Sequence, residues 1–187
     1  MRLFRTRAAA AACAALLLAA CDNDPLLPGE GVLAFRYSGA REGRYVIRGT
    51  PTGGRSEYAT AHVGANGTTT IQAFSSTEGV RGDFVVLVVR GLTTPGEVSA
   101  CGNVQVEPCF AGHVTFDADP SVEQPTANTV LVANTFLFTS GEVTFTRSPA
   151  SGRVEGRFSG RARNATGAEI TIRDGAFAVV VPELLPA

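Results

Sequence analysis

The stretch GEVTFTRSPASGRVEGRFSGRARNATGAEITIRDGAFAVVV, residues 141–181, alternates apolar and polar side chains over most of its length. Within residues 153–163, the positions in phase with Val154 and Phe158 carry only apolar or small side chains, and the positions between them carry Arg, Glu and Ser. Successive side chains of a β-strand point to opposite faces, so this pattern predicts strands with one buried and one solvated face. Such a division is typical of antiparallel sheets, and we expect an antiparallel meander here.

The same period of two recurs along the rest of the chain between glycine-containing turns, and no segment keeps a helical period of 3.6 residues. The sequence predicts about eleven strands, over residues 32–38, 44–50, 57–63, 68–74, 83–90, 111–117, 129–138, 141–147, 153–163, 168–173 and 176–182. Short strands at this spacing predict an all-β domain, and we expect an antiparallel β-sandwich. A lipocalin-like β-barrel is the alternative.

Two of the predicted strands are apolar on both faces, namely FVVLVV at residues 84–89 and VLVANTFLF at residues 130–138. We expect each of them to be covered on both sides. A loop or a short helix over a central strand would provide this cover, and so would a seam where two sheets meet. These strands also motivate the alternative of a barrel that surrounds an apolar ligand.

Residues 1–20 have the layout of a secretory signal peptide, because Arg2, Arg5 and Arg7 precede an apolar run over residues 8–20. An apolar helix of ~13 residues spans roughly 20 Å, which is short of the ~30 Å hydrocarbon core of a membrane. The run therefore predicts a targeting segment that is cleaved from the chain.

The motif Leu18-Ala19-Ala20-Cys21 resembles the lipobox of bacterial lipoproteins. The resemblance implies that the signal is cut before Cys21, that the thiol takes a diacylglyceryl group, and that the new amine is often acylated too. Two or three acyl chains make membrane attachment effectively permanent. We therefore expect a lipid-anchored protein of the bacterial cell envelope, on a periplasmic or an outer surface. The alternative is an ordinary signal cleaved after an Ala-x-Ala-like site, which leaves Cys21 free or disulfide-bonded.

The 167 residues that follow Ala20 are enough for one domain. Residues 21–30 begin at the lipidated cysteine and contain two prolines and three acids, so we expect a tether there and a single β domain over residues 31–187. The mature chain would have 13 arginines, no lysine and 17 acids, and therefore a net charge near −4. A nucleic-acid binder usually has a basic domain, so we expect no nucleic-acid partner.

Two cysteines remain once the N-terminal segment is assigned. Cys13 lies in the signal and Cys21 in the lipobox, which leaves Cys101 and Cys109. An exported chain meets an oxidising compartment, so this pair predicts a disulfide. A redox or metal pair would favour the shorter Cys-x-x-Cys spacing.

The segments SGEVTFTR, RVEGRFSGRARN and AEITIRDGAFAVVV together resemble the closing part of a family of bacterial lipoproteins with no assigned function. The likeness covers about 40 residues near the C-terminus, in addition to the anchor motif. It implies a β-sandwich-like envelope domain, and it supplies no catalytic residues.

Side chains for catalysis or metal binding are scarce. His62 and His113 are the only histidines, and we expect both at solvent-facing positions because a zinc site needs three or four ligands. Asp117, Asp119 and Glu123 could supply oxygen ligands, but the segment lacks the glycine of a calcium loop and predicts a turn instead. No serine-hydrolase elbow, P-loop or dinucleotide motif occurs. We expect no metal, no cofactor and no enzyme activity.

The polar face of residues 153–163 carries Arg157, Arg161 and Arg163, with Arg153 just before them and Arg173 on a later strand. Alternate residues of a strand lie ~6.5–7 Å apart, so these guanidinium groups could bind carboxylates or phosphates. The alternative is a solvated face on which Glu155 and Glu169 pair with the arginines.

These observations predict a non-enzymatic, lipid-anchored β-sandwich that binds or scaffolds a partner in the envelope. An envelope protein or an anionic glycan would suit the arginine face. The alternative function is that of a carrier, which holds a small apolar ligand in the cavity of a β-barrel.

Overall fold

The computed structural model describes residues 30–49, 57–64, 66–77, 81–101, 107–118 and 133–182. The predicted signal peptide, Cys21 and the tether up to residue 29 lie outside these ranges, as do Asp119, Glu123 and residues 130–132. Within the described ranges, no helix is both long enough and apolar enough to cross a membrane.

The described residues confirm an all-β chain. The elements are β1 (Gly31–Gly39), β2 (Gly43–Gly49), β3 (Glu57–Val63), β4 (Thr69–Thr77), β5 (Arg81–Arg90), β6 (Gly96–Ser99), β7 (Cys109–Ala118), β8 (Thr135–Arg147), a short 3-10 helix η2 (Pro149–Ser151), β9 (Arg153–Arg163) and β10 (Glu169–Val180). The strand predicted over residues 153–163 has the observed bounds of β9. The four-residue strand β6 was not predicted, because it is too short to show a periodic pattern.

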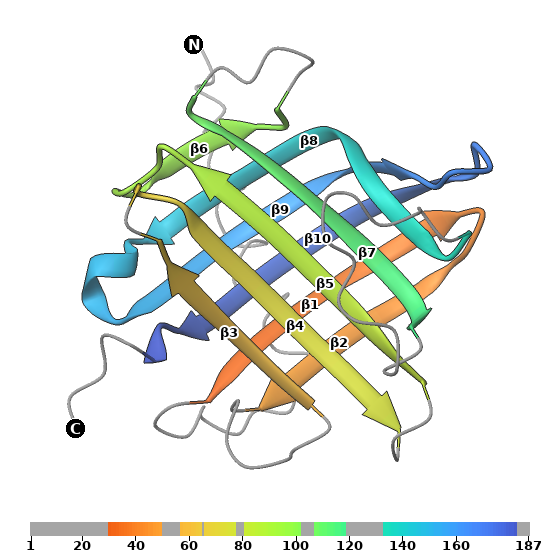
Figure 1. Cartoon of the computed structure of the whole chain (residues 1–187), viewed down its shortest axis with the longest axis horizontal. Coiled ribbons are helices and arrows are strands. Elements are labelled where there is room, and N and C mark those ends of the chain that lie inside the picture. Colours follow the sequence, from red (N-terminus) through yellow and green to blue (C-terminus); the bar gives the residue numbers. More distant parts are fainter. Residues whose placement is uncertain are drawn as a thin grey trace, which may run out of the picture.

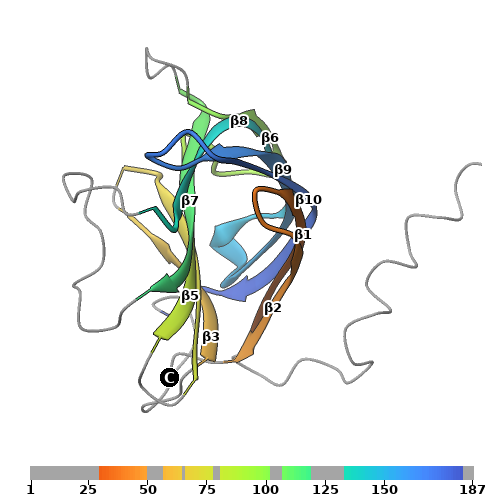
Figure 2. The ribbon, with the colours of Figure 1, turned by 90° about the vertical axis from the view of Figure 1, so that its right-hand side faces the viewer.

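Strands β3, β4, β5, β7, β8, β9 and β10 close into a seven-stranded barrel. Figure 1 shows β3, β4, β5 and β7 crossing in front of β8, β9 and β10, and Figure 2 shows the two walls from the side. The ring closes where β10 meets β3 in parallel, with Val180 opposite Thr60. There the Thr60 hydroxyl donates a hydrogen bond to the Val180 carbonyl oxygen at 3.2 Å.

Three strands lie outside this ring. β1 pairs with β10 and β2 pairs with β1, both antiparallel, so that β10, β1 and β2 continue one wall of the barrel. β6 pairs with β8 in the same antiparallel way.

The predicted sandwich is replaced by its alternative, a barrel, because two predicted strand breaks are bends within continuous strands. β8 runs through residues 139–140, where its register against β9 shifts. β10 runs through a β-bulge between Ile172 and Gly175, in which Asp174 has a φ of 54°. Turn-forming residues such as Gly and Asp suit bulges as well as turns. A bulge bends a strand without ending it, so β8 can pair with β7 at one end and with β9 along the rest.

Side chains fill the interior of the described barrel. The largest of those with almost no exposed surface include Phe35, Phe110, Phe136, Phe145, Ile71 and Leu87. Aromatic rings from different strands meet there, as in the pair Phe35 and Phe158, whose ring centroids lie 5.7 Å apart. Full burial of a side chain of this size stabilises the fold by about 1.5–3 kcal/mol.

The two strands predicted to be covered on both faces differ in the structure. In β5, Phe84 is buried on the outer side, and Val86 and Val88 are half-buried. In β8, Leu137 is 37 % exposed, so the prediction that this strand is covered on both sides is wrong at that position. The sequence pattern shows that both faces of each strand are apolar. Whether the outer face is shielded from solvent depends on which side chains of neighbouring strands pack beside it.

The predicted disulfide between Cys101 and Cys109 is confirmed. The two Cα atoms lie 5.0 Å apart, and the Cys101 amide donates a hydrogen bond to the Phe110 carbonyl oxygen at 2.7 Å. The bond therefore ties the segment after β6 to the beginning of β7.

Candidate binding site

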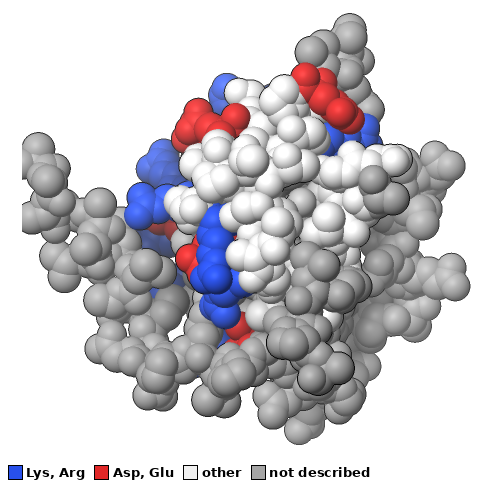
Figure 3. All heavy atoms as spheres, turned by 90° about the vertical axis from the view of Figure 1, so that its left-hand side faces the viewer, with Lys and Arg blue, Asp and Glu red and all other residues white. Residues whose placement is uncertain are grey.

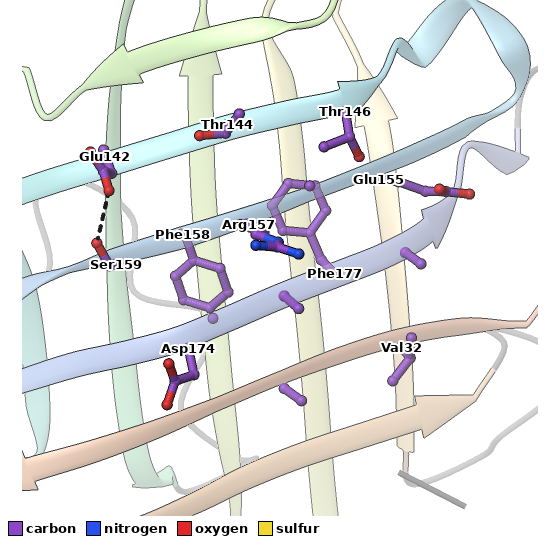
Figure 4. Close-up of a pocket in the computed structure, with 15 residues that line it drawn as sticks. Val32, Glu142, Thr144, Thr146, Glu155, Arg157, Phe158, Ser159, Asp174 and Phe177 are labelled. Carbon is purple, nitrogen blue, oxygen red and sulfur yellow. Dashed lines mark hydrogen bonds between the residues drawn. The ribbon is translucent and has the colours of Figure 1, made fainter. Parts of the chain in front are cut away.

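A pocket of about 440 Å³ lies on the outer face of the wall formed by β8, β9, β10 and β1. Figure 4 shows the side chains that line it in rows, with Glu142, Thr144 and Thr146 from β8 and Ser159, Arg157 and Glu155 from β9. These residues alternate along their strands with buried neighbours such as Val143 and Phe158. The pocket therefore opens to the outside of the barrel.

The floor of this outer pocket consists of small apolar side chains, Val32 and Ala34 from β1 and Ala176 and Ala178 from β10. The register aligns them, since Ala34 lies opposite Ala176 and Val32 lies opposite Ala178. Because the side chains on these two adjacent strands are short, the outer surface is depressed here relative to the longer side chains on either side. The result is an apolar depression with a polar border.

Two glycines make the wall thin beneath the pocket. Gly156 lies opposite Phe177, and Gly175 lies opposite Phe158, in the pairing of β9 with β10. Both phenylalanines line the pocket together with the two glycines, and both belong to the hydrophobic core. Because a glycine has no side chain, the ring of its cross-strand neighbour occupies the space on the inner side.

Charged and polar groups surround the floor. Arg157 lies opposite Ala176 on one side and Thr144 on the other, so its guanidinium belongs to the middle of the pocket. Arg157 is exposed and forms no ion pair with any residue that the structure describes. At the border, Ser159 donates a hydrogen bond to Glu142 at 3.4 Å.

A second pocket, of about 480 Å³, adjoins the first. Asp174, the bulged residue of β10, lines both pockets. The bulge sets Arg173 and Asp174 together opposite Ser159, and an aspartate with a positive φ is uncommon outside turns and bulges. The bulge therefore joins the apolar floor to a more polar region that includes Arg36 and Arg173.

The structure places Arg157, Arg161 and Arg163 on one outward face, as the alternation predicts, but gives them different surroundings. Arg163 forms an ion pair with Glu169 at 3.1 Å, and Arg161 donates a hydrogen bond to Ser140 at 3.4 Å. Of the three, only Arg157 lines the outer pocket. Binding of an anionic partner by the three arginines together stays a prediction.

The expected pairing with nearby acids holds in part. Glu169 pairs with Arg163, whereas Glu155 pairs with Arg147 at 3.4 Å and with Arg153 at 3.2 Å. Figure 3 shows the same mixture on the face that it draws, where arginines and acids lie side by side next to a broad uncharged area. Charges of both signs are therefore present on that face (Figure 3).

The two histidines lie apart, one exposed and one largely buried. His62 is exposed, and its ring nitrogen lies 3.1 Å from the Gln72 amide nitrogen. His113 was expected to face solvent, and this is wrong, because its ring packs near Phe84 and its Nε2 is buried without a hydrogen-bond partner among the described residues. Burial lowers the pKa of His113.

Asp117, considered above as a calcium ligand, forms an ion pair with Arg41 at 3.3 Å instead. Its amide donates a hydrogen bond to Asp83 at 3.0 Å. Within the ranges that the structure describes, no three His, Cys, Asp or Glu side chains gather in a way that could hold a metal ion.

The outer pocket was not predicted from the sequence, although part of its signal is present there. Ala176 and Ala178 alternate with Phe177 and Val179, so one face of this segment is bulky and the other is small. Only the register shows that Ala34, some 140 residues earlier, completes the floor. Comparison with known protein families, with curated proteins and with solved structures finds no match to this chain.

Proposed function

We propose that this chain is a non-catalytic binding protein, attached to a membrane of the bacterial envelope through lipid on Cys21, that holds a small ligand with an apolar body. The ligand lies in the outer pocket, on the wall of the barrel. This is the carrier function of the sequence analysis with a different location for the ligand, since side chains occupy the described interior of the barrel.

One observation carries the proposal, namely an apolar floor of four small side chains bordered by a few polar groups. Ligand sites are typically concave, occupy about 300–1,000 Å³ and combine a mostly apolar lining with a small number of polar groups. The outer pocket, at about 440 Å³, agrees with this description in volume and in lining. Arg157 and Glu142 would orient the ligand, while the floor would supply most of the affinity.

The test fills the floor and measures binding of a fluorescent amphiphile, anilinonaphthalene sulfonate, to the full chain. The double variant Ala34→Leu/Ala176→Leu places two large side chains where the ligand would lie. We expect it to weaken binding ~10-fold or more, because the new side chains occupy the space of the ligand's apolar body. Burial of one Leu-sized apolar group contributes more than about 1.4 kcal/mol, and a loss of that size corresponds to a tenfold change in affinity.

The matched control is Ala111→Leu, an equally conservative change at an exposed, outward-facing position on β7 in the opposite wall. It should leave the binding unchanged. Equal affinity in wild type and Ala34→Leu/Ala176→Leu would show that the outer pocket is not the binding site.

A further inference from the structure

Three arginines lie side by side in one row on the outer face of the barrel wall. Arg36 of β1 is directly opposite Arg44 of β2 on one side and Arg173 of β10 on the other. All three are exposed, and their strand neighbours Phe35 and Ile172 are buried in the core. The three side chains therefore project outward from adjacent strands, which are ~4.8 Å apart.

Like charges directly opposite each other on neighbouring strands destabilise a sheet. Arg36 and Arg173 form no ion pair with any acid in the described part of the chain. Arg44 interacts with other groups of the chain, so the uncompensated repulsion is that between Arg36 and Arg173. A bound anion would offset the repulsion between these two guanidinium groups.

The second pocket has the donors for such an anion. Arg36 and Arg173 line it, together with the hydroxyl-bearing residues Ser38, Thr171 and Tyr37. Ser38 and Thr171 are themselves opposite each other, two residues along the strands from the arginine pair. Guanidinium groups bind carboxylate and phosphate oxygens with two parallel hydrogen bonds, and hydroxyl groups can donate further ones.

Acids in the same pocket limit the charge of the ligand. Glu42 and Asp174 also line it, so the two arginines of the pocket lining, Arg36 and Arg173, face two carboxylates. The lining therefore has no excess positive charge, which favours a group with a single negative charge over a dianion.

The arginine pair lies next to the apolar floor. On β1, Ala34 and Arg36 are alternate outward residues, which places them ~6.5–7 Å apart along the strand. On β10, Arg173 and Ala176 are the partners of Arg36 and Ala34, and only Asp174 and Gly175 lie between them. An anionic head bound by the arginines would thus be adjacent to an apolar body in the outer pocket.

We propose that the ligand is an amphiphile with a singly charged oxyanion, such as a carboxylate, a sulfate ester or a phosphodiester, held by Arg36 and Arg173. Its chain lies over Ala34 and Ala176. This inference rests on the proposed function and names the chemical class of the ligand that the outer pocket takes.

The experiment compares two probes of equal chain length, laurate and the neutral dodecyl maltoside, by calorimetric titration below their micelle concentrations. The protein is the full chain with Cys21→Ser, so that no acyl group on the chain competes for the pocket. In Arg36→Gln/Arg173→Gln, laurate should bind ~10-fold or more weakly, since charge-assisted hydrogen bonds are lost, while dodecyl maltoside should bind as before.

The matched control is Arg161→Gln/Arg163→Gln, which removes two exposed arginines of β9 that line neither pocket. It should leave laurate affinity unchanged. The thermal midpoint of Arg36→Gln/Arg173→Gln should not fall below that of the parent, because the change removes a repulsion, so weaker binding would not reflect unfolding.

Unchanged laurate affinity in Arg36→Gln/Arg173→Gln would overturn the inference while leaving the proposed function intact, provided that both probes bind the parent protein. If neither laurate nor dodecyl maltoside binds the parent protein, the proposed function and this inference both fail. If laurate has no advantage over dodecyl maltoside in the parent protein, only the oxyanion inference fails.

Discussion

Phe177 of β10 packs against Gly156 of β9, its cross-strand partner, and the ring fills the space that a side chain at position 156 would occupy. A Cβ atom built on Gly156 would lie 2.5 Å from Cζ of Phe177. Glycine weakens a strand when nothing covers it, and here an aromatic ring supplies the cover. Phe158 and Gly175 repeat the arrangement in the opposite direction, and both pairs lie under the outer pocket.

Gly156→Ala should lower the free energy of unfolding by about 1–3 kcal/mol, because the added methyl group overlaps with the Phe177 ring and with the neighbouring backbone. Urea denaturation followed by circular dichroism measures the change. Gly64→Ala is the control, since its Cβ would meet only ordinary contacts, the nearest at 3.6 Å. If the two variants lose equal stability, the close approach of Phe177 is not the cause.

Thr60→Val should lower the free energy of unfolding by about 1–3 kcal/mol, because it removes the only hydroxyl that bonds the Val180 carbonyl oxygen at the closure of the barrel in the described structure. Thermal unfolding of the purified chain checks this. Thr60→Ser keeps the hydroxyl and should recover most of the loss. Equal midpoints for the Val and Ser variants would mean that this hydrogen bond contributes nothing.

Tyr45 should make the fold less stable at alkaline pH. Burial raises the pKa of its phenol, and the negative charges of Asp83 and Glu57 raise that pKa further. The unfolded phenol loses its proton near pH ~10 while the folded one keeps it, so the stability from this group is present below pH ~10 and is lost as pH rises above that value. The slope is up to about 1.4 kcal/mol per pH unit.

Guanidinium denaturation near pH ~8 and near pH ~11 measures this effect, because the two values lie on either side of the unfolded pKa. Tyr45→Phe should show a smaller loss between the two pH values, and near pH ~8 it should cost less than about 1 kcal/mol because both hydrogen bonds of the hydroxyl are long, at 3.4 Å. Burial also raises the pKa values of Tyr37 and Tyr58, so part of the loss should remain. An identical loss in wild type and Tyr45→Phe would contradict the role of Tyr45.

Cys21→Ser should release the protein from membranes, because the acyl chains that the lipobox implies require the Cys21 thiol. Expression in a bacterium, followed by fractionation of membranes and soluble extract, measures the distribution. Cys13→Ser, in the predicted signal, serves as the control and should leave the protein with the membranes. Retention of Cys21→Ser in the membrane fraction would disprove the lipid anchor.

The faces of most strands can be predicted from the sequence alone, since alternation along a strand is a local property, but β6 and the continuity of β8 and β10 cannot. The bounds of β9 and the outward direction of Arg157, Arg161 and Arg163 follow from period two alone. The disulfide of Cys101 and Cys109 was predicted by counting the cysteines that would remain if the chain is exported, and the structure contains it. His113 escaped this reasoning, because alternation assigns it an outward direction but does not say what packs outside the strand.

The barrel and the candidate site follow only from the tertiary structure, because both depend on residues that are distant along the chain. Closure joins Thr60 to Val180, which are 120 positions apart, and no local pattern indicates that pairing. The bulge at Asp174 looks like a turn in the sequence until the strands on both sides are seen to pair with the same partners. Register then brings Arg36 beside Arg173 and Ala34 beside Ala176, and register is set by how all the strands bury their apolar faces together.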